Sequence, residues 1–159
     1  MSQSLVQAMG QLVARDEQGR TALIVAAQHG MSGLASILLK NGSDPNDFDE
    51  NRDTALFIAI AEHPRRVALI MALLEAGADV RAANNVGDTP LHAAALVAND
   101  AWCRALIDRG ARVDTKNVAG QTPIDYIFDH DLRLKIEAYG RSKQALQQTT
   151  AAGRDRTAN

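Results

Sequence analysis

The chain has 159 residues, which fits one domain with a buried core, and its 17 basic and 19 acidic residues give a formal net charge of −2. A charge so near zero provides no general field to attract a polyanion, so we expect no nucleic-acid partner. The single cysteine excludes an intrachain disulfide and a cysteine-based zinc site, no stretch approaches the roughly 18 apolar residues of a membrane span, and residues 1–15 do not form a secretory signal. These features predict a cytoplasmic protein without a membrane segment.

Two series of marker residues recur along the chain. A threonine followed by a small residue or proline, and then by Leu or Ile, returns at spacings of 33, 35 and 33 residues, and a glycine returns at spacings of 35 and 33. Both series lengthen by two residues in the second unit, which places an insertion near His63 and Pro64. The threonines are Thr21, Thr54, Thr89 and Thr122, and the glycines are Gly42, Gly77 and Gly110.

Each unit is expected to fold as a helix–turn–helix. A threonine hydroxyl can cap the first helix, and the proline after Thr89 or Thr122 has its φ preset for a first helical turn. The glycine after the second helix can end that helix in a left-handed conformation without steric cost. Because only 4% of the residues are aromatic, the core is expected to consist of Ala, Leu, Ile and Val, which suits close-packed helices.

The third unit carries Thr89-Pro90-Leu91-His92-Ala93 and resembles the ankyrin repeat, whose signature is T-P-L-H-x-A. The same markers recur in register over roughly residues 5–139. The resemblance implies an all-α fold, an ankyrin-repeat solenoid of about four helix–turn–helix repeats with hairpin-like loops and capping half-repeats. Since such units bury surface only against their sequence neighbours, we expect an elongated monomer.

The markers divide the chain into six segments. Residues 1–15 align without a gap to the end of a repeat and are expected to be an N-terminal capping half-repeat. The terminal helix near residues 131–139 has the polar outer face of a cap, and the polar residues after it are expected to be disordered. The segments are 1–15, the N-terminal cap; 16–48, repeat 1; 49–83, repeat 2 with the insertion; 84–116, repeat 3; 117–140, repeat 4 or C-terminal cap; and 141–159, the disordered tail.

Arg52 and Pro64 depart from the repeat pattern. Arg52 occupies the place of a turn glycine, and a left-handed backbone there would cost roughly 1–2 kcal/mol. Pro64 is expected to end the first helix of repeat 2 by His63, and deleting two residues of the surface loop that follows is expected to cost little folding free energy. Trp102 is expected to pack between the third and fourth units.

The sequence contains no convincing catalytic, cofactor or metal site, and we expect the protein not to be an enzyme. His92 belongs to the repeat signature, so a structural role is favoured over acid–base chemistry. The other histidines show no metal-ligand spacing, and Cys103 is expected to be a small buried hydrophobe. The segment 30–33 lacks the second glycine of a nucleophile elbow, and the segment from Asp47 lacks the glycine and glutamate of a calcium loop.

The acidic residues of repeat 2 leave two interpretations open. They can form a solvated hairpin tip, or they can form an acidic patch that faces a basic partner. The apolar residues Phe48, Val86 and Val118 align with positions that the family exposes on its concave side, which indicates an interaction site. Leu96 and Val97 align there too, although they could simply fill the turn between two helices.

The resemblance implies a protein–protein interaction module that binds a partner protein through a concave face of hairpin tips and first helices. A sharper version is an immunity-type inhibitor of a partner enzyme or toxin, as in bacteria, and the alternative of another class is an enzyme or the regulatory subunit of an enzyme. The positions at which the family contacts its partners correspond here to Glu17, Gln18, Arg20, Gln28, His29, Phe48, Asp49, Glu50, Asn51, Asp53, Glu62, Asn85, Val86, Asp88, Leu96, Val97, Lys116, Val118, Gln121 and His130.

Overall fold

The computed structural model describes residues 14–155 of the chain, and it describes side chains through residue 151. Helices form in pairs, one pair in each of the first three repeats, and the fourth unit has a short 3-10 helix followed by a long helix. The all-α fold expected from the repeat pattern is therefore confirmed. The elements are α2 (Ala22–Gln28), α3 (Ser32–Lys40), α4 (Ala55–Glu62), α5 (Val67–Glu75), α6 (Pro90–Leu96), α7 (Asp100–Asp108), η1 (Pro123–Tyr126) and α8 (His130–Asp155).

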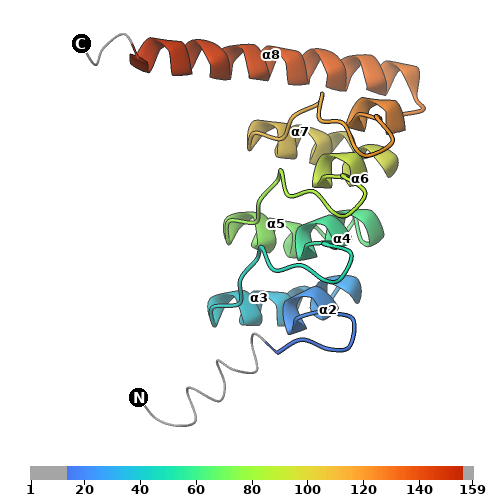
Figure 1. Ribbon diagram of the computed structural model, residues 1–159, viewed down its shortest axis with the longest axis vertical. Coiled ribbons are helices and arrows are strands. Elements are labelled where there is room, and N and C mark those ends of the chain that lie inside the picture. The colour runs from blue at the N-terminus through green and yellow to red at the C-terminus, as the bar shows by residue number, and fades with distance from the viewer. Residues whose placement is uncertain (1–13, 156–159) are drawn as a thin grey trace.

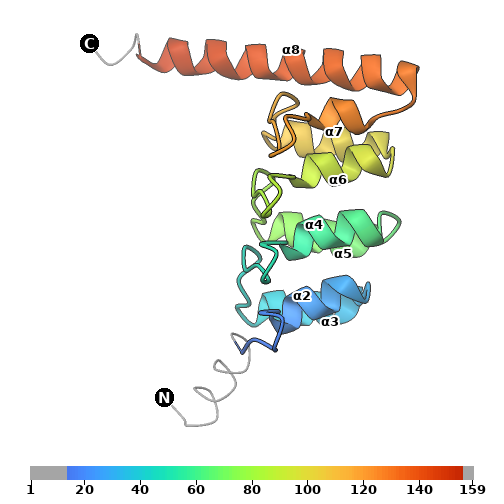
Figure 2. The same cartoon turned by 45° about the vertical axis from the view of Figure 1, so that its right-hand side comes forward.

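The helix pairs stack into a column (Figure 1). The first helices α2, α4 and α6 pack on one another in order and η1 packs on α6, while α3 packs on α5 and α8 lies across α7 at the end of the column. The loops that precede the first helices all project to one side (Figure 2). We call the surface formed by these hairpin tips and the first helices the inner face.

All four threonine markers stand at the N-cap, but their hydroxyls are used differently, and that of Thr21 has no hydrogen-bond partner among the described residues. Thr54 Oγ1 accepts a hydrogen bond from Phe57 N at 3.3 Å, and at Thr122 the Asp125 carboxylate accepts from both the backbone N–H and the hydroxyl at 2.8 Å. Equivalent leucines in the first three units, at positions 23, 56 and 91, are at most 1% exposed. The repeat markers thus fix where each first helix begins and which of its faces is buried.

The insertion in repeat 2 is shared between a helix and a loop. Helix α4 ends at Glu62, as the proline predicts, and residues 63–66 link it to α5. The loop is attached on both sides, because His63 Nε2 lies 2.8 Å from Gln28 O and Trp102 Nε1 donates to Pro64 O at 2.7 Å. The segment is the longer inter-helix loop that the insertion predicts, and these bonds anchor it to repeats 1 and 3, while the low cost of a two-residue deletion stays a prediction. The expectation that Trp102 packs between the third and fourth units is wrong, since its indole N–H bonds to repeat 2.

The C-terminal segment differs most from expectation. Helix α8 continues to Asp155, so residues 141–155 are helical where a disordered tail was expected, and the helix projects beyond the column (Figures 1 and 2). Its first half is held to α7, because Tyr139 Oη donates to Asp108 Oδ1 at 2.6 Å and Lys143 Nζ lies 2.9 Å from the same oxygen. These contacts extend the ordered helix past the end of the repeat pattern.

The expected N-terminal capping half-repeat falls almost entirely outside the described residues. Within residues 14–155 no strand forms, and the loop of repeat 2 contains a single bridge between Phe48 and Thr54. Nor does any helix in this described range combine the length and the apolar character needed to cross a bilayer.

Candidate protein-binding surface

The hairpin tips lie one above another along one edge of the column (Figure 2). Backbone hydrogen bonds join each tip to the next, much as they join neighbouring strands, so the tips are held at fixed positions. The donor and acceptor pairs are Glu50 N with Gln18 O at 3.2 Å, Asn85 N with Asn51 O at 2.9 Å, and Val118 N with Val86 O at 2.9 Å.

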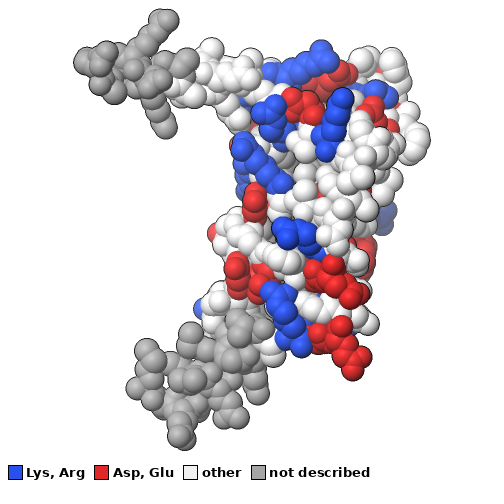
Figure 3. All heavy atoms as spheres, in the orientation of Figure 1, with Lys and Arg blue, Asp and Glu red and all other residues white. Residues whose placement is uncertain are grey.

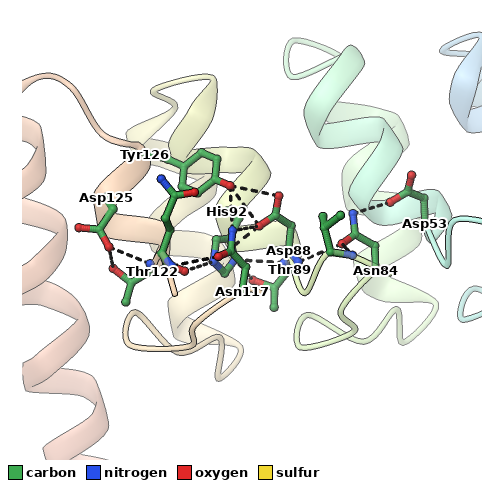
Figure 4. A network of polar contacts seen from close by, with 11 residues as sticks. Asp53, Asn84, Asp88, Thr89, His92, Asn117, Thr122, Asp125 and Tyr126 are labelled. Atoms are coloured by element: carbon green, nitrogen blue, oxygen red, sulfur yellow. Dashed lines mark hydrogen bonds and ion pairs between the residues drawn. The ribbon is translucent and has the colours of Figure 1, made fainter. Parts of the chain in front are cut away.

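In repeats 3 and 4, side-chain amides hold each tip internally and also bind the preceding repeat (Figure 4), whereas the Asp16 and Asp49 carboxylates hold the first two tips internally. Asn84 Oδ1 accepts from the backbone N–H groups of Val86 and Asp88 at 3.1 and 2.9 Å, while its Nδ2 donates to Asp53 Oδ1 at 2.9 Å. Asn117 repeats the arrangement, with Nδ2 donating to Asp88 Oδ1 at 2.8 Å. The polar groups of the tips thus satisfy one another and leave the side chains at the turn apices free to face outward.

Every predicted partner-contact residue is exposed or half-buried, and none belongs to the core. The row of tips brings together the predicted contact residues near positions 17–18, 50–51, 85–86 and 118. A second row is formed by the C-terminal ends of the first helices, where Gln28, Glu62 and Leu96 are the last residues of α2, α4 and α6. Their placement on the surface is compatible with partner binding, and their binding role stays a prediction.

The fourth unit does not present its predicted residues in the same way. Because η1 is a single 3-10 turn, there is no fourth first helix to carry His130 at its end. His130 is instead the first residue of α8. Its assignment by alignment to the second row is therefore wrong, whereas Val118 and Gln121 keep their places at the fourth tip.

Phe48 lies beneath two arginines. The guanidinium of Arg52 lies 4.5 Å from the ring centroid and that of Arg15 lies 5.9 Å from it, and the ring remains 39% exposed. Arg15 also bonds Asp47 Oδ1 at 2.6 Å. Arg52 has a φ of 61°, where the other turns have glycine, so its backbone is in the left-handed region and its stacking on Phe48 offsets part of that strain. Arginines, rather than only carboxylates, therefore border this aromatic ring.

The carboxylates of repeat 2 lie close to one another. Burial raises the pKa of Asp53 above its ordinary value, and the neighbouring charges of Asp49, Asp88 and Glu62 raise it further, against the hydrogen bond from Asn84. Among the described residues, no ion pair neutralises Asp49, Asp53 or Glu62. The inner face of repeat 2 therefore carries uncompensated negative charge (Figure 3).

Comparison with known proteins places this geometry in a family. A family model described as ankyrin repeats in three copies matches residues 3–84, and a model described as an ankyrin repeat matches residues 86–118. The chain belongs to the ankyrin-repeat family. Repeats of this family are protein–protein interaction modules, which agrees with a surface whose outward-facing side chains the core does not use.

Similar proteins include larger ankyrin-repeat proteins of animals. The Caenorhabditis elegans homolog of transient receptor potential cation channel subfamily A member 1 is 28% identical over 84% of this chain, which spans 11% of that protein. Human ankyrin repeat and SOCS box protein 16 is 38% identical over 71% of the chain, which spans 26% of it. Mouse protein phosphatase 1 regulatory subunit 12A is 39% identical over 84% of the chain, which spans 12% of it.

The ankyrin signature histidine, His92, has the structural role that the sequence predicts. Its Nδ1 accepts from the backbone N–H and the hydroxyl of Thr89 at 3.0 and 2.9 Å, which leaves Nε2 protonated and 3.3 Å from Gln121 O (Figure 4). The ring is 1% exposed and meets the Tyr126 ring edge-on at 5.6 Å. His92 thus joins the third repeat to the fourth in its neutral form.

We expect protonation of His92 to destabilise the fold. Burial lowers the pKa of His92 in the folded protein below its ordinary value of 6.5. The unfolded chain therefore binds the proton first, so the stability from the neutral ring is complete above pH 6.5 and is lost as the pH falls through the folded-state pKa. One such group changes the free energy of unfolding by at most about 1.4 kcal/mol per pH unit.

Urea unfolding at several pH values between 7.5 and 5.0 measures this effect. The His92→Gln variant is the control, because it keeps the other three histidines of the chain. Wild type is expected to lose stability more steeply than the variant as the pH falls. Parallel pH profiles would show that His92 is not the source of the acid sensitivity.

Cys103 is inert in this family scaffold. The thiol lies on α7 at 0% exposure, and burial raises its pKa to about 12. The thiolate needed for nucleophilic attack or metal binding is therefore inaccessible near neutral pH. In the part of the chain that the structure describes, no three His, Cys, Asp or Glu side chains are grouped to hold a metal ion.

Two aromatic residues of this surface were not anticipated from the sequence. Phe128, in the loop after η1, is 91% exposed, and Tyr126 Oη donates to the Asp88 carboxylate at 3.3 Å. Counting 33 residues from Ala95 aligns Phe128 with a buried alanine. The same position is a buried Ala27 in repeat 1 and a buried Ile60 in repeat 2, so a large aromatic residue there is the signal that the fourth repeat departs from the pattern.

Proposed function

We propose that the chain binds one partner protein through its inner face and has no enzymatic activity of its own. The observation that carries this proposal is the row of hairpin tips, which are fixed to one another by backbone bonds while their apical side chains face outward. Such preorganisation lowers the entropy cost of binding, because the contact residues already hold their places before the partner arrives.

The chemistry of the buried groups supports a binding role over a catalytic one. His92 is fully engaged in joining two repeats, and the thiol of Cys103 is held protonated in the core. The name of the mouse relative describes a regulatory subunit of a phosphatase. Regulation of a partner enzyme is therefore the second candidate function. We also propose that the protein is cytoplasmic and monomeric and that its partner has a basic surface.

The proposal is tested by affinity capture with the full chain, followed by calorimetry on the purified partner. The inner-face variant carries Val86→Asp and Val118→Asp at neighbouring tips, and the control carries Val67→Asp at the exposed start of α5. We expect the inner-face variant to lose the stoichiometric partner and the control to keep it. Capture lost only with Val67→Asp, or catalytic turnover abolished by a single histidine or aspartate substitution, would contradict the proposal.

A further inference from the structure

The inner face changes character at one boundary along the column. At the hairpin tips, the exposed residues of repeats 1 and 2 include Glu17 and Glu50, whereas those of repeats 3 and 4 include Val86 and Val118. Val86 and Val118 are 55% and 82% exposed, and the backbone bond between them places them side by side. The tips are therefore acidic at one end of the row and apolar at the other.

The ends of the first helices show the same change at the same boundary. Glu62 is the exposed last residue of α4, and Leu96, 56% exposed, is the last residue of α6. Phe128, 91% exposed, follows η1, which packs on α6. Two separate rows thus pass from polar and acidic groups over repeats 1 and 2 to apolar groups over repeats 3 and 4. In Figure 3 the acidic atoms gather mainly over the lower repeats, where Lys and Arg atoms lie among them, and uncharged atoms cover much of the right-hand side of the upper repeats.

At the acidic end, the carboxylates without an ion pair outnumber the nearby arginines that could neutralise them. Arg15 pairs with Asp47 and Arg20 pairs with Asp16, which leaves Glu17, Asp49, Glu50, Asp53 and Glu62 without an ion pair among these residues. Arg52 adds one positive charge at the tip of repeat 2, where its guanidinium stacks on Phe48, and Arg65 and Arg66 add two more in the loop after α4. The five carboxylates outnumber these three cations, so a positively charged segment would complement them.

The apolar end is larger than a single exposed side chain. Val86 and Val118 are neighbours at the tips, and Leu96 and Phe128 occupy the opposite edge of the same two units. Charged groups lie at this end as well: hydrogen bonds from Thr122 lower the pKa of Asp125, and the charges of Arg133 and Lys116 lower it further. Large apolar groups gathered on one surface commonly mark a protein interaction site.

We propose, on the basis of the proposed function, that the partner presents one segment with a basic end and an apolar end, lying along the inner face with its basic end over repeats 1 and 2. With neighbouring units about 10 Å apart, four tips span about 30 Å. That length corresponds to about 9 residues of extended chain or about 20 residues of helix. Lys and Arg side chains at one end would meet the carboxylates, and Leu, Phe or Trp side chains at the other would cover the valines and Phe128.

Selection from a library of random 20-residue peptides displayed on phage, with the full chain as target, tests this polarity. We expect the enriched peptides to have Lys or Arg at one end and large apolar residues at the other. Replacing Glu50 and Glu62 by Lys should weaken the binding of the enriched peptides about tenfold, and so should replacing Val118 and Phe128 by Asp. The matched controls are Glu75→Lys, at the end of the outer helix α5, and Val67→Asp, at its start.

Photo-crosslinking determines the direction in which a selected peptide lies along the inner face. A benzoylphenylalanine in place of Gln18 should react with the basic end of a selected peptide, and one in place of Ala119 should react with the apolar end. If the selected peptides bind the inner face but lack this charge pattern, or crosslink in the reverse direction, this inference is overturned and the proposed function remains intact. Peptides affected only by the control substitutions would overturn both, and displacement of the peptides by a single-stranded oligonucleotide would point instead to a nucleic-acid ligand.

Discussion

Replacing Trp102 by Ala is expected to lower the free energy of unfolding by about 3–5 kcal/mol. Trp102 is 7% exposed on α7, and its indole N–H donates to Pro64 O at 2.7 Å in the loop of repeat 2. The substitution therefore removes a large buried ring and also leaves a carbonyl of the preceding repeat unpaired. In a solenoid, stability depends on such contacts between neighbouring units, so loss of this one weakens the coupling between repeats 2 and 3.

The variant Trp102→Phe separates the two parts of this effect. Phenylalanine keeps most of the buried ring but cannot donate to Pro64 O, so a loss of about 1–3 kcal/mol is expected from the unpaired carbonyl together with the smaller ring. Denaturant unfolding measures both variants, and amide exchange in residues 63–66 reports whether the loop is released. If Trp102→Ala costs no more than an ordinary surface substitution, the indole does not join the two repeats.

The repeat spacing predicts the fold well, because its markers act locally. Thr54 caps the helix that begins one residue later, and Pro64 ends the same helix, so short-range chemistry sets these boundaries. The same reasoning places the predicted contact residues on the surface, since each belongs to a turn or to a helix end. The sequence pattern shows that a position is exposed, but it does not show which other part of the molecule contacts the side chain there.

The wrong predictions for Trp102 and for the C-terminal segment both concern contacts between units. The direction of Trp102 depends on an inserted loop about 38 residues earlier in the chain, which no local pattern encodes. The order of residues 141–155 depends on Tyr139 and Lys143 meeting Asp108 on another helix. Likewise, the stacking of Arg52 on Phe48 follows from the geometry of one hairpin, and the sequence alone shows only two nearby residues.

Substituting Gly140 by Ala is expected to destabilise the protein, although the same change in an exposed helix would stabilise it. Gly140 is buried in α8 against Val113, and a Cβ there would lie 2.2 Å from Val113 Cγ1 and 3.0 Å from Cγ2. Overpacking of this kind typically costs about 1–3 kcal/mol. The gain in helix propensity is only about 1 kcal/mol, so the net result is a loss.

Two further variants test the cause. Gly33→Ala in α3 is the matched control, because a Cβ there meets nothing within 4 Å, and this change should leave stability unchanged or raise it. A Val113→Ala background removes the contacts with Cγ1 and Cγ2 and leaves only the Cβ of residue 113, at 3.1 Å, so Gly140→Ala should cost much less there, and the double-mutant cycle should show a favourable coupling. Urea unfolding measures all of these proteins. Because α8 packs on α7, the Gly140→Ala variant should also lose amide protection in α8 before the repeats unfold. Equal stabilisation by Gly33→Ala and Gly140→Ala in the wild-type background would show that α8 does not rest on Val113.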